Sequence, residues 1–209
     1  MIIKKYIYDK TTRLLHAGIG ISVILLFVTA KLGRTFYEYN QFRIILWNIH
    51  LCFGYLLGFL FIYRVIWFFL GNEYAKPKNF LHLKQLYAVF IKRKKLEWKF
   101  GHHPIAGVVY LVFYLLLISI IISGFFLARI EHDLGPIAER FFDDMNTYAQ
   151  MITWHEIFSN LILVFFLLHI LAQIKHQMND GVPVISSMKD GYQYKKIEGD
   201  LNEENTNFM

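Results

Sequence analysis

The chain has little of what holds soluble or cross-linked proteins together. Among 209 residues there is one cysteine, Cys52, which excludes an internal disulfide, a Cys-ligated zinc site and an iron–sulfur cluster. Cys52 stands in an apolar stretch and is expected to be a small buried hydrophobe. Charged residues make up only 18% of the chain, against about 25% in soluble domains. Nucleophile–base motifs, a Walker loop and a dinucleotide fingerprint are also missing, so no soluble catalytic constellation is predicted.

Apolar residues are abundant instead, at 56% hydrophobic and 18% aromatic. A soluble fold of this size could not bury so much apolar surface, whereas a bilayer is itself an apolar solvent. A helix needs about 20 mostly apolar residues to cross the hydrocarbon, and helices pair every backbone group internally. The stretches that qualify are Leu14–Leu32, Ile44–Leu70, Ile105–Ala128 and Trp154–Ile174. The predicted fold is an all-α integral membrane four-helix bundle over residues 1–177, followed by a cytoplasmic tail over 178–209.

The net charge of +6 is sorted between the connections rather than arrayed on one face. The connection Gly71–Pro104 holds eight Lys and Arg residues, whereas the connection between the third and fourth spans holds two, with five acidic residues. Positive charge marks cytoplasmic connections, so both termini and Gly71–Pro104 are predicted in the cytoplasm of a bacterial inner membrane. This sorting indicates a lipid environment and no nucleic-acid partner.

Four histidines fall within or at the ends of the predicted spans: His16, His50, His155 and His169. Ionisable groups inside a membrane are costly and usually functional. His155 and His169 are 14 residues apart, which separates them by about 21 Å along one face of a helix. His16 matches the depth of His169 near the cytoplasm, and His50 matches that of His155 near the outer surface.

Paired imidazoles from facing helices suit a cofactor held inside a bundle. A haem iron takes two axial ligands, whereas zinc normally takes four. The pattern therefore predicts two haem sites, His16 with His169 on the cytoplasmic side and His50 with His155 on the outer side. The alternative for each histidine alone is an ordinary helix-end residue or a satisfied buried polar group.

Two further features of the second span allow two interpretations each. Arg64 lies 14 residues after His50, at the depth of the cytoplasmic pair, where it could bind a haem propionate or reach the membrane interface. Gly54 lies one turn after His50, where a missing side chain leaves room for a porphyrin or allows close helix packing.

An ordered set of motifs covers nearly the whole chain. It comprises YDKTTRLLH, H-x3-G with a later YRVIW, GHHPIAG, GPIAERF, WHE with a later LLH, and DGVPVISSMKDG. This set resembles the bacterial cytochrome b561 group, which is similar to the b-type cytochrome subunits of nickel–iron hydrogenases. The resemblance implies two haem b, electron exchange with membrane quinone, and the same four histidines as ligands. The chain departs from the family pattern at His103, where Asn is expected, and at Tyr8, where Trp is common.

The predicted function is transmembrane electron transfer between the quinone pool, ubiquinone or menaquinone, and a periplasmic c-type cytochrome or hydrogenase. The alternatives are a stand-alone superoxide:ubiquinone oxidoreductase and a haem-free anchor or small transporter. The acidic outer connection favours the first, because it would repel the superoxide anion. A quinone head group is predicted beside Arg64, His102 and His103, with an outer site near His50 and Trp154 as the alternative.

Overall fold

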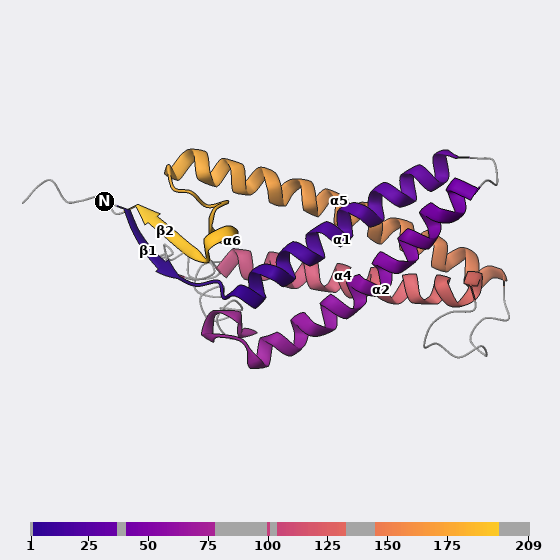
Figure 1. Ribbon diagram of the computed structural model, residues 1–209, viewed down its shortest axis with the longest axis horizontal. Helices are drawn as coiled ribbons and strands as arrows, with labels where there is room; N and C mark the ends of the chain where they lie inside the picture. Colours follow the sequence, from indigo (N-terminus) through magenta and orange to yellow (C-terminus); the bar gives the residue numbers. More distant parts are fainter. Residues whose placement is uncertain (1, 37–40, 78–99, 101–103, 133–144, 197–209) are drawn as a thin grey trace, which may run out of the picture.

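The fold is built on four long helices. The computed structural model describes residues 2–36, 41–77, 100, 104–132 and 145–196. The helices are α1 (Lys10–Thr35), α2 (Gln41–Leu70), α4 (Pro104–His132) and α5 (Met145–Asp180). The bundle consists of two antiparallel hairpins, α1 against α2 and α4 against α5, joined by contacts between α2 and α4 (Figure 1). All four helices are long and apolar enough to cross a membrane, which confirms the helical membrane fold.

The helices extend beyond the predicted spans at several ends. Helix α1 begins at Lys10 because Asp9 caps it, its Oδ1 accepting a hydrogen bond from the Thr12 amide at 2.7 Å. Helix α5 begins at Met145, well before the predicted Trp154. Hydropathy detects only the part of a helix that lies in hydrocarbon, while the backbone hydrogen bonding continues past it.

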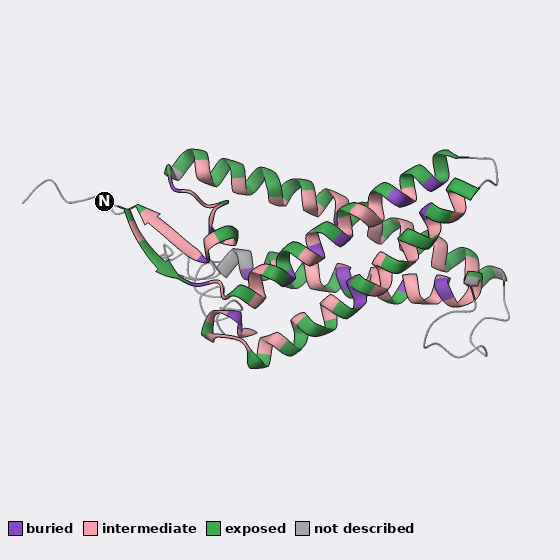
Figure 2. Ribbon diagram, viewed as in Figure 1, coloured by how far each residue is buried: buried purple, intermediate pink, exposed green. Residues whose placement is uncertain are grey.

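A small core lies midway along the bundle. It takes one buried residue from each helix: Ile19, Leu57, Leu117 and Ile162. Ile162 is seven residues from both His155 and His169, so this core separates the two ends of the bundle. Much of the outer surface is exposed (Figure 2), and many of its exposed side chains are large and apolar, with Phe69 at 73% exposure. In a multi-pass membrane protein that surface faces lipid rather than water.

The prediction that Cys52 is buried is wrong, because its side chain is exposed on α2. Its apolar neighbours suggested a protein interior. In a membrane helix, however, the face toward lipid is as apolar as the face toward the core, so an apolar neighbourhood does not distinguish them.

Two short strands join the ends of the described chain. Strand β1 (Ile2–Tyr6) pairs antiparallel with β2 (Tyr192–Lys196), with Tyr6 opposite Tyr192. The short helix α6 (Ser187–Asp190) precedes β2, and the sheet lies at one end of the bundle (Figure 1). The sequence pattern predicts no strand here, because five-residue strands are too short to stand out beside four apolar spans.

Gly191 closes this arrangement. Its φ is 87°, and a Cβ there would lie 2.6 Å from the Tyr8 carbonyl oxygen, so only glycine fits. The Gly191 carbonyl accepts hydrogen bonds from the amides of Ile7 and Tyr8 at 2.9 and 3.0 Å. We call β1, β2, α6 and Gly191 the strand clasp. It connects the start of α1 to the segment that follows α5.

Candidate functional site

The four membrane histidines lie in two pairs. The ring centres of His16 and His169 are 6.2 Å apart, and those of His50 and His155 are 6.4 Å apart. Helix α5 contributes one histidine to each pair, while α1 and α2 contribute the partners. These are the pairs that depth along the helices predicts.

The spacing of the rings fits a metal ion shared by two imidazoles. Metal–imidazole bonds of about 2.0–2.1 Å, with each ring centre about 1 Å behind its nitrogen, place two ring centres about 6 Å apart. Among the described residues, no three His, Cys, Asp or Glu side chains gather around one point. The donor set is therefore two neutral nitrogens per site, which suits the axial positions of a haem iron.

We call His50 and His155 the outer pair, and His16 and His169 the inner pair, after the sides predicted for them from the sequence. The outer pair lines a large cavity to which all four helices contribute residues. Its volume is about 990 Å³, and His50, His155 and Gly54 are among its lining residues. Cavities of about 300–1,000 Å³ are typical of sites for cofactors and other small molecules. The outer end of the bundle thus has room for a ligand of porphyrin size.

Hydrogen bonds fix the ring of His50. Its Nδ1 lies 3.0 Å from the Leu26 carbonyl oxygen and 3.2 Å from Thr29 Oγ1. A carbonyl can only accept, so Nδ1 carries the proton and donates it. The neutral ring then presents the lone pair of Nε2, the nitrogen available for coordination.

The ring of His155 is held in the same way from α4. Its Nδ1 lies 3.0 Å from Ser123 Oγ, whose own proton is donated to the Ile120 carbonyl at 3.1 Å. A Cβ on Gly124 would lie 3.2 Å from Cε1 of this ring, so glycine lets the imidazole pack close to α4. Both outer histidines therefore have the same protonated nitrogen and the same kind of support.

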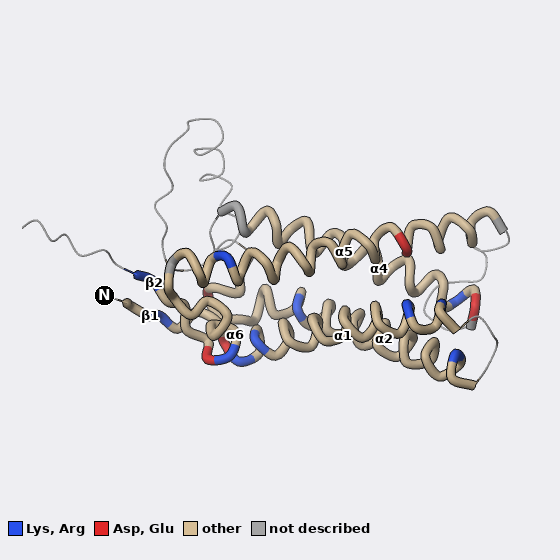
Figure 3. The backbone as a smooth tube through the Cα atoms, turned by 90° about the horizontal axis from the view of Figure 1, so that it is seen from above, with Lys and Arg blue, Asp and Glu red and all other residues tan. Residues whose placement is uncertain are grey.

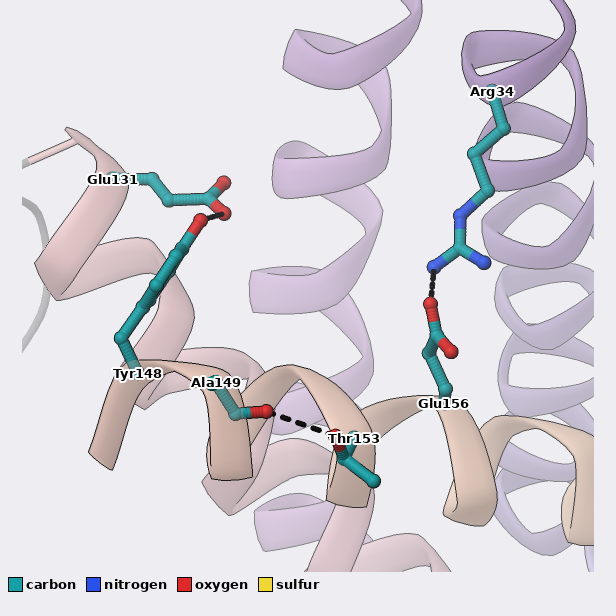
Figure 4. A network of polar contacts seen from close by, with 6 residues as sticks. All are labelled: Arg34, Glu131, Tyr148, Ala149, Thr153 and Glu156. Carbon is teal, nitrogen blue, oxygen red and sulfur yellow. Dashed lines mark hydrogen bonds and ion pairs between the residues drawn. The ribbon is translucent and has the colours of Figure 1, made fainter. Parts of the chain in front are cut away.

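Polar contacts also tie the helices together at the outer rim. Arg34 on α1 forms an ion pair with Glu156 on α5 at 2.5 Å, and Tyr148 donates a hydrogen bond to Glu131 at 2.8 Å (Figure 4). Glu156 follows His155 directly in sequence, yet its carboxylate is directed toward Arg34 (Figure 4).

The inner pair has different surroundings. The ring of His169 stacks on Phe165, with centres 6.3 Å apart and planes 8° apart, and Phe165 stacks in turn on Phe113. Within the described residues, neither His16 nor His169 has a hydrogen-bond partner for its ring. His16 is exposed, whereas both outer histidines are half-buried.

Arg64 lies at the inner end and turns toward α4. Its Nε donates to Tyr114 Oη at 3.2 Å, and its guanidinium lies 4.7 Å from the centre of the Phe68 ring. Its Nη1 is buried and has no hydrogen-bond partner among the described residues. A half-buried guanidinium with a spare donor fits a propionate partner better than an interfacial position.

Four glycines of α1 and α2 form two groups that differ in what surrounds them. A Cβ on Gly18 would lie 3.1 Å from Leu60, and one on Gly58 would lie 2.8 Å from Phe125, so both allow close helix packing. Gly20 and Gly54 face open space. Each follows a pairing histidine by four residues, His16 or His50, which places it on the same helix face.

Sequence reasoning missed Thr29 and Ser123. Both are buried, at 5% and 4% exposure, and both contact an outer histidine. The sequence did contain a signal for both residues. A hydroxyl side chain inside a long apolar span needs a hydrogen-bond partner, and a histidine of a neighbouring helix is a candidate. The quinone-site residues His102 and His103, and the motif GPIAERF, lie outside the described residues.

Membrane-spanning helices with facing imidazole pairs are typical of membrane-embedded cytochromes. The chain belongs to the prokaryotic cytochrome b561 family, whose pattern matches residues 7–191. It is therefore a b-type, haem-binding cytochrome of transmembrane electron transfer.

Two relatives show how far the similarity extends. The chain is 24% identical to a probable Ni/Fe-hydrogenase B-type cytochrome subunit of Bradyrhizobium diazoefficiens, with 89% of this chain and 84% of the relative aligned. It is 23% identical to the probable Ni/Fe-hydrogenase 1 B-type cytochrome subunit of Escherichia coli K12, with 97% of this chain and 96% of the relative aligned. No solved structure matches the chain.

Proposed function

We propose that this cytochrome carries electrons across the membrane through two haem b, one between His16 and His169 and one between His50 and His155. The observation that carries the proposal is the pair of ring spacings, 6.2 and 6.4 Å, at two levels of one bundle. Bound haem supplies one-electron exchange at each level. The histidines hold it, Gly20 and Gly54 leave space beside it, and Arg64 offers a guanidinium to the inner propionates.

The clasp end of the bundle faces the cytoplasm in this proposal. Lys and Arg residues cluster around β1, β2 and α6 (Figure 3), and positive charge marks the cytoplasmic side. Accessibility of single cysteines in a Cys52→Ser background tests this orientation. An impermeant reagent applied from the periplasm should label Thr147→Cys and miss Lys189→Cys, and the reverse pattern would invert the assignment.

We further propose that the outer haem exchanges electrons with a periplasmic redox partner and the inner haem with quinone. The relatives named as hydrogenase cytochrome subunits support a nickel–iron hydrogenase as that partner, with a c-type cytochrome as the alternative. His16 is the exposed residue of the inner pair, which supports quinone exchange at that level, because a head group in the lipid can approach it closely.

Haem reduction by quinol tests the function. Haem-loaded protein in liposomes is mixed with a short-chain ubiquinol or menaquinol, and the reduced haem absorbance is followed. Both haems should reduce. An added oxidised c-type cytochrome should then reoxidise them, whereas a hydrogenase partner supplied with hydrogen should itself reduce the haems, which then pass the electrons to quinone. Failure of every quinol to reduce either haem would contradict the proposal. Reduction by superoxide alone would favour the superoxide:ubiquinone oxidoreductase instead.

A further inference from the structure

The two outer histidines are supported by the same local arrangement on two different helices. On α1, Thr29 Oγ1 donates to the carbonyls of Leu25 and Leu26 at 2.7 and 3.1 Å. On α4, Ser123 Oγ donates to the Ile120 carbonyl at 3.1 Å. In each case a hydroxyl bonds the carbonyl three residues earlier on its own helix.

In each case that hydroxyl also faces an imidazole of the neighbouring helix. His50 Nδ1 contacts the Leu26 carbonyl and Thr29 Oγ1, and His155 Nδ1 contacts Ser123 Oγ. Because each hydroxyl proton is directed into its own helix, its oxygen lone pair is left to accept from Nδ1–H. In each hairpin, the first helix therefore supplies the acceptors for the histidine of the second helix.

We propose that Thr29 and Ser123 are positioning residues that fix the orientation of the outer histidines and lower the midpoint potential of the outer haem. The inference rests on the proposed assignment of His50 and His155 as haem ligands. Hydrogen bonds to the far nitrogen of a ligating imidazole orient the ring and raise its basicity. A more basic ligand stabilises the ferric state, so the support lowers the potential of the outer level relative to the inner one.

Hydroxyl-removing variants test the proposal on purified, haem-loaded protein. Thr29→Val keeps the shape of the side chain and removes the hydroxyl, while Thr29→Ser keeps the hydroxyl. Ser123→Ala is matched by Ser119→Ala one turn earlier, where the hydroxyl bonds the Leu115 carbonyl at 2.8 Å. Thr35→Val on α1 is the matching control for Thr29, since its hydroxyl bonds the Lys31 carbonyl at 2.9 Å.

The readouts are the two midpoint potentials and the electron paramagnetic resonance signals of the ferric haems. Ser123→Ala and Thr29→Val should raise the outer potential, shift the outer ferric signal and weaken outer haem retention by about tenfold. A tenfold loss confined to the ferric state corresponds to a rise of about 59 mV for one electron. Thr29→Ser, both control variants and the inner haem should stay at wild-type values.

The outcomes separate this inference from the function on which it rests. Two haems in every variant with unchanged potentials and signals would overturn the positioning role and leave the proposed function standing. Wild-type protein with no haem at the outer level would overturn both. If Ser123→Ala fails to fold, the comparison of Thr29→Val with Thr29→Ser remains a test. Equal outer midpoint potentials and equal outer ferric signals in these two variants would contradict the proposal.

Discussion

The outer and inner histidine pairs are held in place by different means. At the outer level, Nδ1 of each ring is hydrogen-bonded from the neighbouring helix, and the Arg34–Glu156 ion pair joins α1 to α5. At the inner level, the described residues offer the His169 ring stacking on Phe165 and offer neither ring a hydrogen bond. There the backbone provides the link, because the strand clasp joins the start of α1, which carries His16, to the segment that follows α5.

The difference shows how one bundle can hold two similar sites with different properties. Side-chain hydrogen bonds fix the orientation of the outer rings and their protonated nitrogen. The clasp fixes only where two helix ends lie, and the inner rings have no hydrogen bond within the described residues. We therefore expect a tightly defined outer site and a more open inner site, as exchange with a membrane-dissolved quinone would require.

Removing single ligands should give the largest effects. His155→Ala or His50→Ala should abolish the outer haem, and His169→Ala or His16→Ala the inner haem, each halving the haem content because a low-spin haem needs both axial ligands. Difference spectra of the four variants would check this. His176→Ala, further along α5, is the control and should keep both haems. Identical spectral losses in His16→Ala and His50→Ala would show that the pairing is wrong.

Filling the space beside each pair should have the next largest effect. Gly54→Leu should reduce outer haem content and Gly20→Leu inner haem content, because a side chain would occupy open space one turn from the paired histidine. The haem-to-protein ratio and the difference spectrum measure both. Equal loss of both haems in either variant would contradict the assignment of these glycines to separate levels.

Destabilising the strand clasp should have a smaller effect, and it should affect the inner haem more than the outer haem. Gly191→Ala should destabilise the fold by about 1–3 kcal/mol, through the cost of a left-handed non-glycine residue and the contact with the Tyr8 carbonyl. Gly181→Ala, also at positive φ but with no atom within 4 Å of its Cβ, should cost less. Thermal unfolding measures the difference, and the inner haem should be lost first. Earlier loss of the outer haem would mean that the clasp does not support the inner pair.

Removing one positive charge at each level should give the smallest effects. Arg64→Gln should lower the midpoint potential of the inner haem by on the order of 1 kcal/mol per electron. The Arg64 cation destabilises the ferric state, so its removal favours that state. Arg34→Gln should lower the outer potential less, since Glu156 already offsets the Arg34 charge. Potentiometric titration measures both shifts. A larger shift from Arg34→Gln would indicate that the ion pair does not form around bound haem.

Much of this architecture could be predicted from the sequence because membranes impose simple rules. Hydropathy located the helices, and the spacing of His155 and His169 along one helix gave the two levels. Burial could not be predicted in the same way, as Cys52 shows, because lipid and protein interiors select the same residues.

The supporting contacts were harder to predict, because they depend on how neighbouring helices meet. Nothing in the sequence pairs Thr29 with His50, which is 21 residues away on another helix. The strand clasp likewise joins segments from opposite ends of the chain, and its need for Gly191 becomes visible only when Tyr8 lies beside it. Helix periodicity predicts which residues share one face of a helix. Which residues of two neighbouring helices come into contact depends also on how each helix is rotated about its axis and shifted along it.

The haem content of the purified wild-type protein tests the central claim most directly. Pyridine haemochrome analysis, divided by the protein concentration from amino-acid analysis, should give about two haem b per chain, because each of the two imidazole pairs supplies one complete axial ligand set. A ratio close to one, or a covalently bound c-type spectrum, would contradict the two-level account.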